Sequence, residues 1–260
     1  MLSLLFRVRG AACLSAILLA LMLSPSPAFA DPAACPKPLR TFHMFNRDGK
    51  TLSCFDAWQQ DFFAELGCDL QFVDANPGMN YRVEQLSAAH VEVITGLAKR
   101  PDGPFQYSRA IGNNNSYLYR HVDSPQWDQI KDWCDDTMQQ ATLIAPAEGY
   151  YGEKVEMLRK NPQCAKWLLL LPRGTGLSFD MLQKKRADLM VSSERYYKML
   201  PPDDAKNYVR LPNIAIEGPV YLAFSAKVSS EFIKRVNQLV LKRRASGTAT
   251  CELSAANSQD

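Results

Sequence analysis

The sequence predicts an α/β protein made of two similar units, each a mostly parallel sheet flanked by helices. Short apolar segments rich in β-branched and aromatic residues alternate with longer segments whose apolar side chains recur at helical spacing. The same alternation repeats in the second half of the chain. Its 260 residues fit two units of about a hundred residues better than one large core. Because strands alternate with helices, neighbouring strands should be parallel and joined by right-handed crossovers.

In the first unit, a helix is expected to begin at Ser53, since Phe55, Trp58 and Phe62 recur at helical spacing. Gly67 ends this helix, because glycine readily adopts the left-handed backbone that follows many helices. The other elements expected here are strands at 39–45, 69–73 and 91–94 and a helix at 81–90.

The second unit is expected to follow the same order. Its helices should cover 126–134, 178–186 and a stretch from Gly149 to about residue 160, and its strands 141–145, 167–171 and 188–191. A strand at 220–224 and a helix at 229–245 close the chain, and Gly247 is a natural stop for that helix.

The first thirty residues have the pattern of a secretory signal peptide. Two arginines precede an apolar run at about 11–23, and small residues then lead to an A-x-A site that ends at Ala30. Cleavage is expected after Ala30, with a periplasmic mature protein. The alternatives are a transmembrane anchor, for which the run falls short of the roughly 20 residues needed, and a lipoprotein anchor at Cys35, whose lipobox is poor. We expect no stable membrane insertion of the mature chain.

Charge and cysteine content narrow the classes of function. The 30 basic and 27 acidic side chains give a net charge of +3, too balanced for a nucleic-acid-binding protein judged on charge. Because Cys13 lies in the signal peptide, the mature chain keeps an even number of cysteines, as expected for disulfides in an oxidising compartment. The three histidines are scattered along the chain, so we expect neither a metal site nor a cofactor.

A series of segments follows an order shared with a known family. In the first half they read FDAW at 55–58 before LG at 66–67, RVEQL at 82–86 and VEVITG at 91–96. In the second half they read SYLYR at 116–120, IAPAEGYYG at 144–152, RADLMV at 186–191 and YLAF at 221–224. Taken in order, these segments resemble the family 3 periplasmic solute-binding proteins, the polar amino-acid-binding components of ABC importers.

The resemblance implies the type II periplasmic-binding-protein fold, in which two lobes joined by a two-crossing hinge enclose a ligand. Lobe 1 would comprise 31–118 and 219–260, and lobe 2 would comprise 119–218. The hinge would lie near 117–121 and 213–218, and its expected motion is closure around a small ligand. Ligand-binding groups would lie at the carboxyl ends of the strands.

The implied fold also constrains the disulfides. Cys54 and Cys68 bracket one helix and would lie roughly 20 Å apart at about 1.5 Å per residue, which is too far for a disulfide. In two of the remaining pairs both cysteines precede strands, so they would meet at one edge of a sheet. The pairs implied in this way are Cys35–Cys68 and Cys134–Cys164, which leaves Cys54–Cys251. The alternative is that one or two of these pairs remain free thiols.

The ligand clamp that the resemblance implies is altered in this chain. Family members that bind amino acids carry T-P-E-R followed by F-S-x-P-Y, and the arginine holds the ligand carboxylate through paired hydrogen bonds. Here Gly103 stands at the position of that arginine and Ile111 at that of the final tyrosine. The aspartate that would bind the ligand ammonium falls at Ser193.

Displaced charges and aromatic side chains are therefore the candidate ligand contacts. We expect Arg100 or Arg109 to supply the guanidinium and Glu194 the carboxylate, with solvated surface positions as the alternative. Aromatic side chains beside the strand ends suit a small polar or aromatic ligand. The predicted ligand-binding residues are Phe45, Arg100, Tyr107, Ser108, Arg109, Gly149, Tyr150, Tyr151, Ser193 and Glu194.

These features predict a monomeric binding protein, not an enzyme. It would capture a small polar ligand, amino-acid-like or a small organic ion, for an ABC permease or a membrane sensor. One alternative is a degenerate binding fold that now serves as a periplasmic docking module, since the clamp is altered. A second alternative is an enzyme with Glu148 or Glu194 as general acid. It is less favoured, because the sequence lacks a G-x-S-x-G elbow, a metal cluster and a Cys–His pattern.

Overall fold

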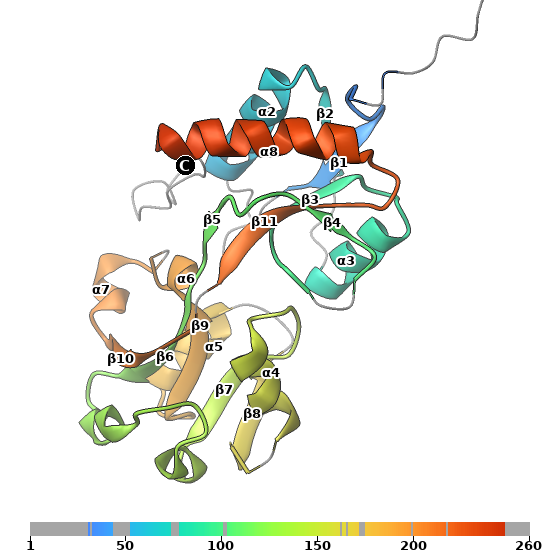
Figure 1. Ribbon diagram of the computed structural model, residues 1–260. Helices are drawn as coiled ribbons and strands as arrows, with labels where there is room; N and C mark the ends of the chain where they lie inside the picture. The colour runs from blue at the N-terminus through green and yellow to red at the C-terminus, as the bar shows by residue number, and fades with distance from the viewer. Residues whose placement is uncertain are drawn as a thin grey trace, which may run out of the picture.

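The structure is a computed structural model with two α/β lobes (Figure 1). It describes residues 31, 33–43, 53–73, 78–100, 103–161, 163–164, 166–171, 175–198, 200–216 and 218–247, without the side chains of 53, 175–178 and 212–215. The signal peptide, Phe45 and Cys251 lie outside the described residues. Within that part of the chain, no helix has the length and apolar character needed to cross a membrane.

The first lobe contains the beginning and the end of the described chain. Its elements are β1 (Leu39–Phe42), α2 (Ser53–Glu65), β2 (Leu70–Val73), α3 (Met79–Ser87), β3 (Val93–Ala98), β4 (Gln106–Tyr107), β5 (Gly112–Asn113), β11 (Pro219–Phe224) and α8 (Ser230–Ala245). β1 runs parallel to β2, whereas β11 runs antiparallel to β3, β4 and β5. The Glu92 N–H, just before β3, donates to the Arg40 carbonyl of β1 at 3.1 Å and so links the two groups of strands.

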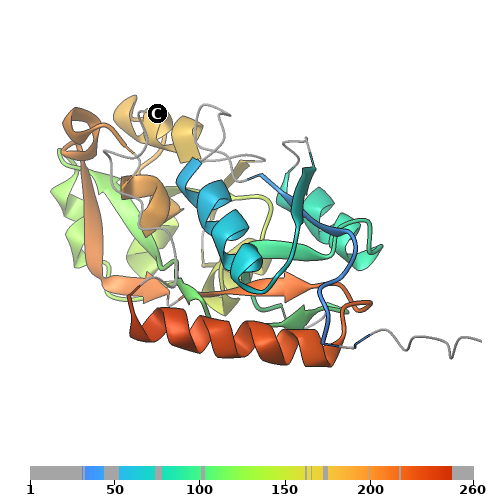
Figure 2. The same cartoon turned by 90° about the horizontal axis from the view of Figure 1, so that it is seen from above.

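Successive side chains of this sheet pack against helices on opposite faces, as the two-residue period of a strand dictates. Val93 and Phe224 lie in one buried cluster with Phe62 of α2 and Phe232 of α8. Ile94, the next residue of β3, lies in a second cluster on the α3 side. Figure 2 shows α8 running alongside β11. The sheet is thus covered on both faces, and only its ends remain for a ligand.

The second lobe is built on one five-stranded sheet in the order β10-β6-β9-β7-β8. Its elements are β6 (Ser116–His121), the 3-10 helices η1 (Pro125–Gln129) and η2 (Asp136–Gln140), β7 (Thr142–Pro146), α4 (Glu153–Lys160), β8 (Trp167–Leu171), α5 (Thr175–Gln183), β9 (Leu189–Ser193), α6 (Glu194–Lys198), α7 (Pro202–Ala205) and β10 (Tyr208–Ile216). β7 is parallel to β8 and β9, whereas β6 is antiparallel to β9 and β10. Leu143 of β7 packs with Val155 of α4 on one face, and Ile144 packs with Phe179 of α5 on the other.

The chain passes between the lobes twice, and the two passages are hydrogen-bonded to each other. The Asn114 N–H donates to the Gly218 carbonyl at 2.7 Å. The Gly218 N–H donates to Asn115 Oδ1 at 3.1 Å. The Glu194 N–H at the start of α6 donates to the Asn115 carbonyl at 2.8 Å. The crossings therefore form one connected segment next to the end of β9.

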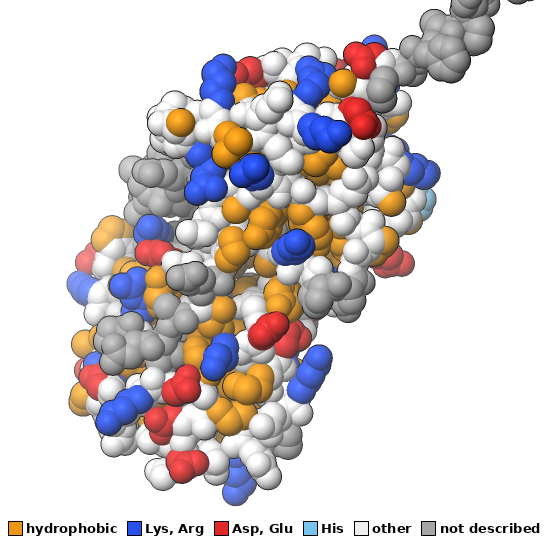
Figure 3. Space-filling model, in the orientation of Figure 1, with side chains coloured by type: hydrophobic (Ala, Val, Ile, Leu, Met, Phe, Trp, Pro, Cys, Tyr) orange, Lys and Arg blue, Asp and Glu red, His pale blue; other side chains and the backbone are white. Residues whose placement is uncertain are grey.

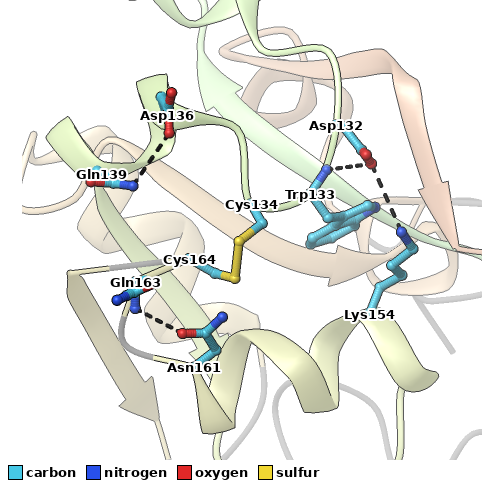
Figure 4. The surroundings of a disulfide bond; sticks show 9 residues. All are labelled: Asp132, Trp133, Cys134, Asp136, Gln139, Lys154, Asn161, Gln163 and Cys164. Carbon is cyan, nitrogen blue, oxygen red and sulfur yellow. Dashed lines mark hydrogen bonds and ion pairs between the residues drawn. A yellow bond between two sulfur atoms is a disulfide. The ribbon is translucent and has the colours of Figure 1, made fainter.

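Two of the implied disulfides are confirmed. Cys35 bonds Cys68 with 5.4 Å between the Cα atoms, and Cys134 bonds Cys164 with 4.2 Å between theirs. Figure 4 shows the second bond between the segment before η2 and the turn after α4. Cys54 is disulfide-bonded, and its pairing with Cys251 stays a prediction, because Cys251 lies outside the described residues.

Most predicted elements lie within a few residues of their expected bounds, and the strand at Trp167–Leu171 matches them. Gly67 and Gly247 both have φ of +75° after their helices, as their predicted role requires. The strand expected at 91–94 instead covers Val93–Ala98, because Ala89 has φ of +54° and the turn after α3 extends beyond it.

The helix predicted at 126–134 is wrong. The segment forms only the single 3-10 helix Pro125–Gln129, and Cys134 has φ of +71°, which an α-helix does not allow. Trp127 and Trp133 both pack into the same buried cluster. Two residues six positions apart on one α-helix would instead lie on different faces of it. Burial of both indoles and the Cys134 disulfide override the apolar spacing that predicted a helix.

Candidate functional site

At the contact between the lobes, helices of the first lobe lie opposite the ends of strands of the second lobe. The Arg195 guanidinium of α6 lies 4.3 Å from the centroid of the Phe55 ring of α2. A Cβ added at Gly78, which precedes α3, would lie 2.7 Å from Glu148 Oε2. Figure 3 shows apolar side chains gathered between the two lobes with a few charged groups among them. We call this region the interlobe junction and define it by Phe55, Asp56, Arg82, Glu148, Tyr151, Arg195 and Tyr196.

On the first lobe, a buried polar network supports the junction. Asp56 accepts a hydrogen bond from Gln59 Nε2 at 3.4 Å and pairs with His43 Nδ1 at 2.7 Å. The Gln59 side chain is fully buried. Its Oε1 accepts from the hydroxyls of Thr95 at 2.6 Å and Thr41 at 3.4 Å. The first turns of α2 are thereby fixed to β1 and β3, which positions Asp56 and Phe55.

Arg82 extends from α3 into the same region. Its Nη2 donates to the His43 carbonyl at 2.9 Å, and its guanidinium lies 5.2 Å from the centroid of the Phe42 ring. Burial lowers the pKa of Arg82, while Tyr196 of the second lobe and Asp56 act electrostatically in the opposite direction. Arg82 thus places a buried positive charge near Tyr196, across the boundary between the lobes.

On the second lobe, α6 begins directly after β9 and carries Arg195 and Tyr196 to the junction. Burial against the first lobe lowers the pKa of Arg195. Just before them, the hydroxyls of Ser192 and Ser193 are buried, and neither has a hydrogen-bond partner among the described residues. The end of β9 is therefore rich in polar groups whose bonding capacity is unused.

The loop between β7 and α4 supplies Tyr151. Arg159 of α4 donates to the carbonyls of Pro146 and Gly149 and pairs with Glu156 at 2.6 Å, which fixes the loop. The Arg159 guanidinium lies 5.7 Å from the Tyr151 ring centroid. Burial raises the pKa of Tyr151, and Tyr196 adds to the effect. The Tyr151 phenol is therefore neutral at physiological pH and is available to donate a hydrogen bond.

Four of the predicted ligand-binding residues make contacts that all lie within the first lobe. The Tyr107 hydroxyl accepts from the Arg100 backbone N–H at 3.2 Å. The Ser108 hydroxyl donates to the Arg109 carbonyl and accepts from the Leu222 N–H of β11. The Arg109 backbone N–H donates to Asn237 Oδ1 of α8, and its side chain is exposed. These bonds fix β4 to β11 and bring none of the four to Arg195.

The predicted residues of the second lobe lie closer to the junction. Tyr151 belongs to it, and Gly149, with φ of +83°, begins the turn that carries Tyr150 and Tyr151. Ser193 is buried at the end of β9. Glu194 lies beside it, 3.5 Å from Lys198 Nζ and 3.7 Å from Arg210 Nη1, so this carboxylate already has cationic partners.

Arg82, Arg195 and Tyr196 were not among the ligand contacts predicted from the sequence. Arg82 lies four positions before the buried Leu86 on the same face of α3. A charged residue in an otherwise buried stripe is the signal that identifies it. Arg195 and Tyr196 follow a buried strand within three residues, where ligand-binding groups collect in α/β folds. Among the described residues, no group of three or more His, Cys, Asp and Glu side chains is placed to hold a metal ion.

Replacing Gln59 by leucine is expected to lower the free energy of unfolding by about 1–2 kcal/mol, because the buried Thr95 hydroxyl loses its acceptor. Urea unfolding followed by circular dichroism measures the change. Gln60→Leu is the matched control, since Gln60 is the next residue of α2 and is exposed. Equal stability of the two variants would contradict the structural role assigned to Gln59.

Comparison with known proteins identifies the fold. No protein-family model and no curated protein matches the sequence. Solved structures do match. The substrate-binding protein of an amino acid ABC transporter shares 17% identity over 81% of this chain and 95% of its own, with a TM-score of 0.59. A histidine kinase sensor domain similar to periplasmic binding proteins shares 12% over 82% and 92%, with a TM-score of 0.66.

A third match is an amino acid ABC transporter substrate-binding protein from Streptococcus pneumoniae bound to L-arginine. It shares 15% identity over 81% of this chain and 90% of its own, with a TM-score of 0.62. In all three cases the match spans most of both chains. The two α/β lobes, the two crossings and these matches together show that the chain has the two-lobed fold of the periplasmic binding proteins.

Proposed function

We propose that this protein captures a small polar ligand between its lobes and presents it to an ABC importer or a membrane sensor. The observation that carries the proposal is the stacking of Arg195 of the second lobe on Phe55 of the first at 4.3 Å. This contact brings a cation and an aromatic face together at the ends of secondary-structure elements from both lobes. A ligand held there touches both lobes at once, which is how a hinged binding protein senses occupancy.

Proteins with similar structures support this proposal. One neighbour is bound to L-arginine, and another is a sensor domain of a histidine kinase. They represent the two destinations proposed for this chain, delivery to an importer and reporting to a sensor. The ligand proposed here is accordingly amino-acid-like or a small organic ion.

We further propose closure about the paired crossings, with lobe 1 comprising 31–115 and 218–260 and lobe 2 comprising 116–217. This division lies a few residues before the one expected at 118, because β6 (Ser116–His121) belongs wholly to the sheet of the second lobe. The hydrogen bonds from Asn114 to Gly218 and from Gly218 to Asn115 keep the crossings together. A hinge of two short adjacent segments restricts the motion to opening and closing of the lobes.

A periplasmic location of a monomeric mature protein is part of the same proposal. The signal-peptide pattern predicts export, and the bonds Cys35–Cys68 and Cys134–Cys164 fit an oxidising compartment. Expression of the full chain with its own leader, followed by mass spectrometry of the exported protein, tests cleavage after Ala30.

Thermal melting of the exported protein tests ligand capture. With amino acids, small organic acids and amines as a panel, at least one compound is expected to raise Tm. A ligand at a hundred times its Kd adds about 2.7 kcal/mol to the free energy of unfolding. No shift with any compound, together with recovery of a stable protein partner, would instead favour the docking alternative. Chemical turnover of a compound would favour the enzyme.

A further inference from the structure

The Arg195 guanidinium has no acceptor in the part of the chain that the structure describes. Among the described residues, no carboxylate, carbonyl or hydroxyl accepts a hydrogen bond from it, and its one described contact is the Phe55 ring at 4.3 Å. Three other arginines with little exposure pair with carboxylates, and the buried Arg82 donates to the His43 carbonyl. These pairs are Arg120–Asp128, Arg159–Glu156 and Arg243 with Asp61 and Glu65. Because a partly buried charge without an acceptor is costly, an anion supplied from outside the chain would stabilise Arg195.

The acidic groups of the region have other positions or partners. Asp56 pairs with His43 at 2.7 Å. Glu194, the residue before Arg195, lies near Lys198 and Arg210. Glu148 lies beside Gly78, and no ion pair joins it to Arg195 in the described part of the chain. No described carboxylate therefore neutralises Arg195.

Phe55 holds the guanidinium in a way that suits a ligand. An aromatic face stabilises the plane of a guanidinium, while the N–H groups at its edge remain directed outward in a planar fork. That fork matches the two oxygens of a carboxylate. Because Phe55 belongs to the other lobe, this contact forms only when the lobes are together.

We propose that Arg195 binds the carboxylate of the ligand, so that the second lobe supplies the carboxylate-binding cation. This inference rests on the proposed function. It reverses the charge that the family resemblance implies, since the ammonium-binding aspartate would stand at Ser193, two residues earlier. The ligand carboxylate thus faces α6, and the chain does not need an arginine at Gly103.

Isothermal titration calorimetry of the exported protein against matched acid and amide pairs tests the assignment. The probes are L-arginine and L-argininamide, L-phenylalanine and L-phenylalaninamide, 3-phenylpropionate and its amide, and succinate and succinamide. In the pair that binds, the acid should bind at least about tenfold more tightly than the amide, because hydrogen bonds to a charged group are lost with the carboxylate. Arg195→Gln should abolish that preference, and Arg195→Lys should retain part of it.

Arg210→Gln is the matched control. Arg210 also stacks on an aromatic ring, that of Tyr117 at 4.4 Å, but it has Glu194 as an ionic partner. This variant should keep the wild-type preference for the acid. Circular dichroism of all variants separates loss of binding from loss of folding, and Arg195→Lys retains a positive charge if Arg195→Gln fails to fold.

The outcomes separate this inference from the proposed function. An Arg195→Gln protein that still prefers the acid overturns the role of Arg195 while leaving ligand capture intact. A wild-type protein that binds acid and amide equally also overturns the role of Arg195 and leaves ligand capture intact. If the wild-type protein binds none of the probes, both the inference and the proposed function fail.

Discussion

Replacing Cys134 and Cys164 together by serine is expected to lower the free energy of unfolding by about 3–4 kcal/mol. Their bond closes a loop with a sequence separation of 30, and that loop contains η2, β7 and α4. Loss of the bond restores the conformational freedom of this segment in the unfolded chain. Cys164 is fully buried in the core of the second lobe, so a serine hydroxyl there adds the cost of a buried polar group.

Urea unfolding of the double variant measures this effect as a shift in the midpoint. The single variants Cys134→Ser and Cys164→Ser should each lose about as much, because either one breaks the bond. Treatment of the wild-type protein with a reductant should lower its stability at least as much, because it also opens Cys35–Cys68 and the disulfide of Cys54. A double variant within about 1 kcal/mol of the wild type would contradict a stabilising role for the disulfide.

The sequence predicted the disulfides and most elements for a common reason. Helices such as Ser53–Glu65 follow from apolar spacing, and Gly67 and Gly247 mark helix ends through a backbone conformation that other residues avoid. Once strands and helices are placed in order, the ends of neighbouring strands are neighbours too. Within the fold that the family resemblance implies, Cys35–Cys68 and Cys134–Cys164 could therefore be inferred from their positions before strands.

The candidate site was less predictable, because its contacts join segments that are distant along the chain. Arg195 meets Phe55 only after both lobes have folded, and its place just after β9 is the one local signal that separates it from an arginine on a solvated helix. Tyr107 and Arg109 stand at positions aligned with the family signature, yet their described contacts are with the first lobe. Position along the chain selected Tyr151, which lies at the interlobe junction, but not its charged groups Arg82 and Arg195, and the ligand contacts themselves stay predictions.

Replacing Gly218 by alanine is expected to lower the free energy of unfolding by about 3 kcal/mol, at the upper end for steric overpacking. A Cβ at this position would lie 2.3 Å from the Asn114 carbonyl oxygen and 3.0 Å from its carbon. Both are backbone atoms, so no side-chain rotation relieves the clash. The two crossings must separate, which breaks the bonds from Asn114 N–H to Gly218 at 2.7 Å and from Gly218 N–H to Asn115 at 3.1 Å.

Gly67→Ala separates this steric effect from the general cost of replacing glycine. Gly67 has φ of +75° with no atom within 4 Å of an added Cβ, so alanine there meets only the left-handed backbone penalty of about 1–2 kcal/mol. In urea unfolding, the Gly218→Ala variant should therefore be less stable than the Gly67→Ala variant, although only Gly67 needs an unusual φ. The reverse order would show that the crossings are not in close contact.

Because the crossings also bond to the first residue of α6 through Asn115, their separation should displace Arg195 and weaken ligand binding, an effect that Gly67→Ala should not produce.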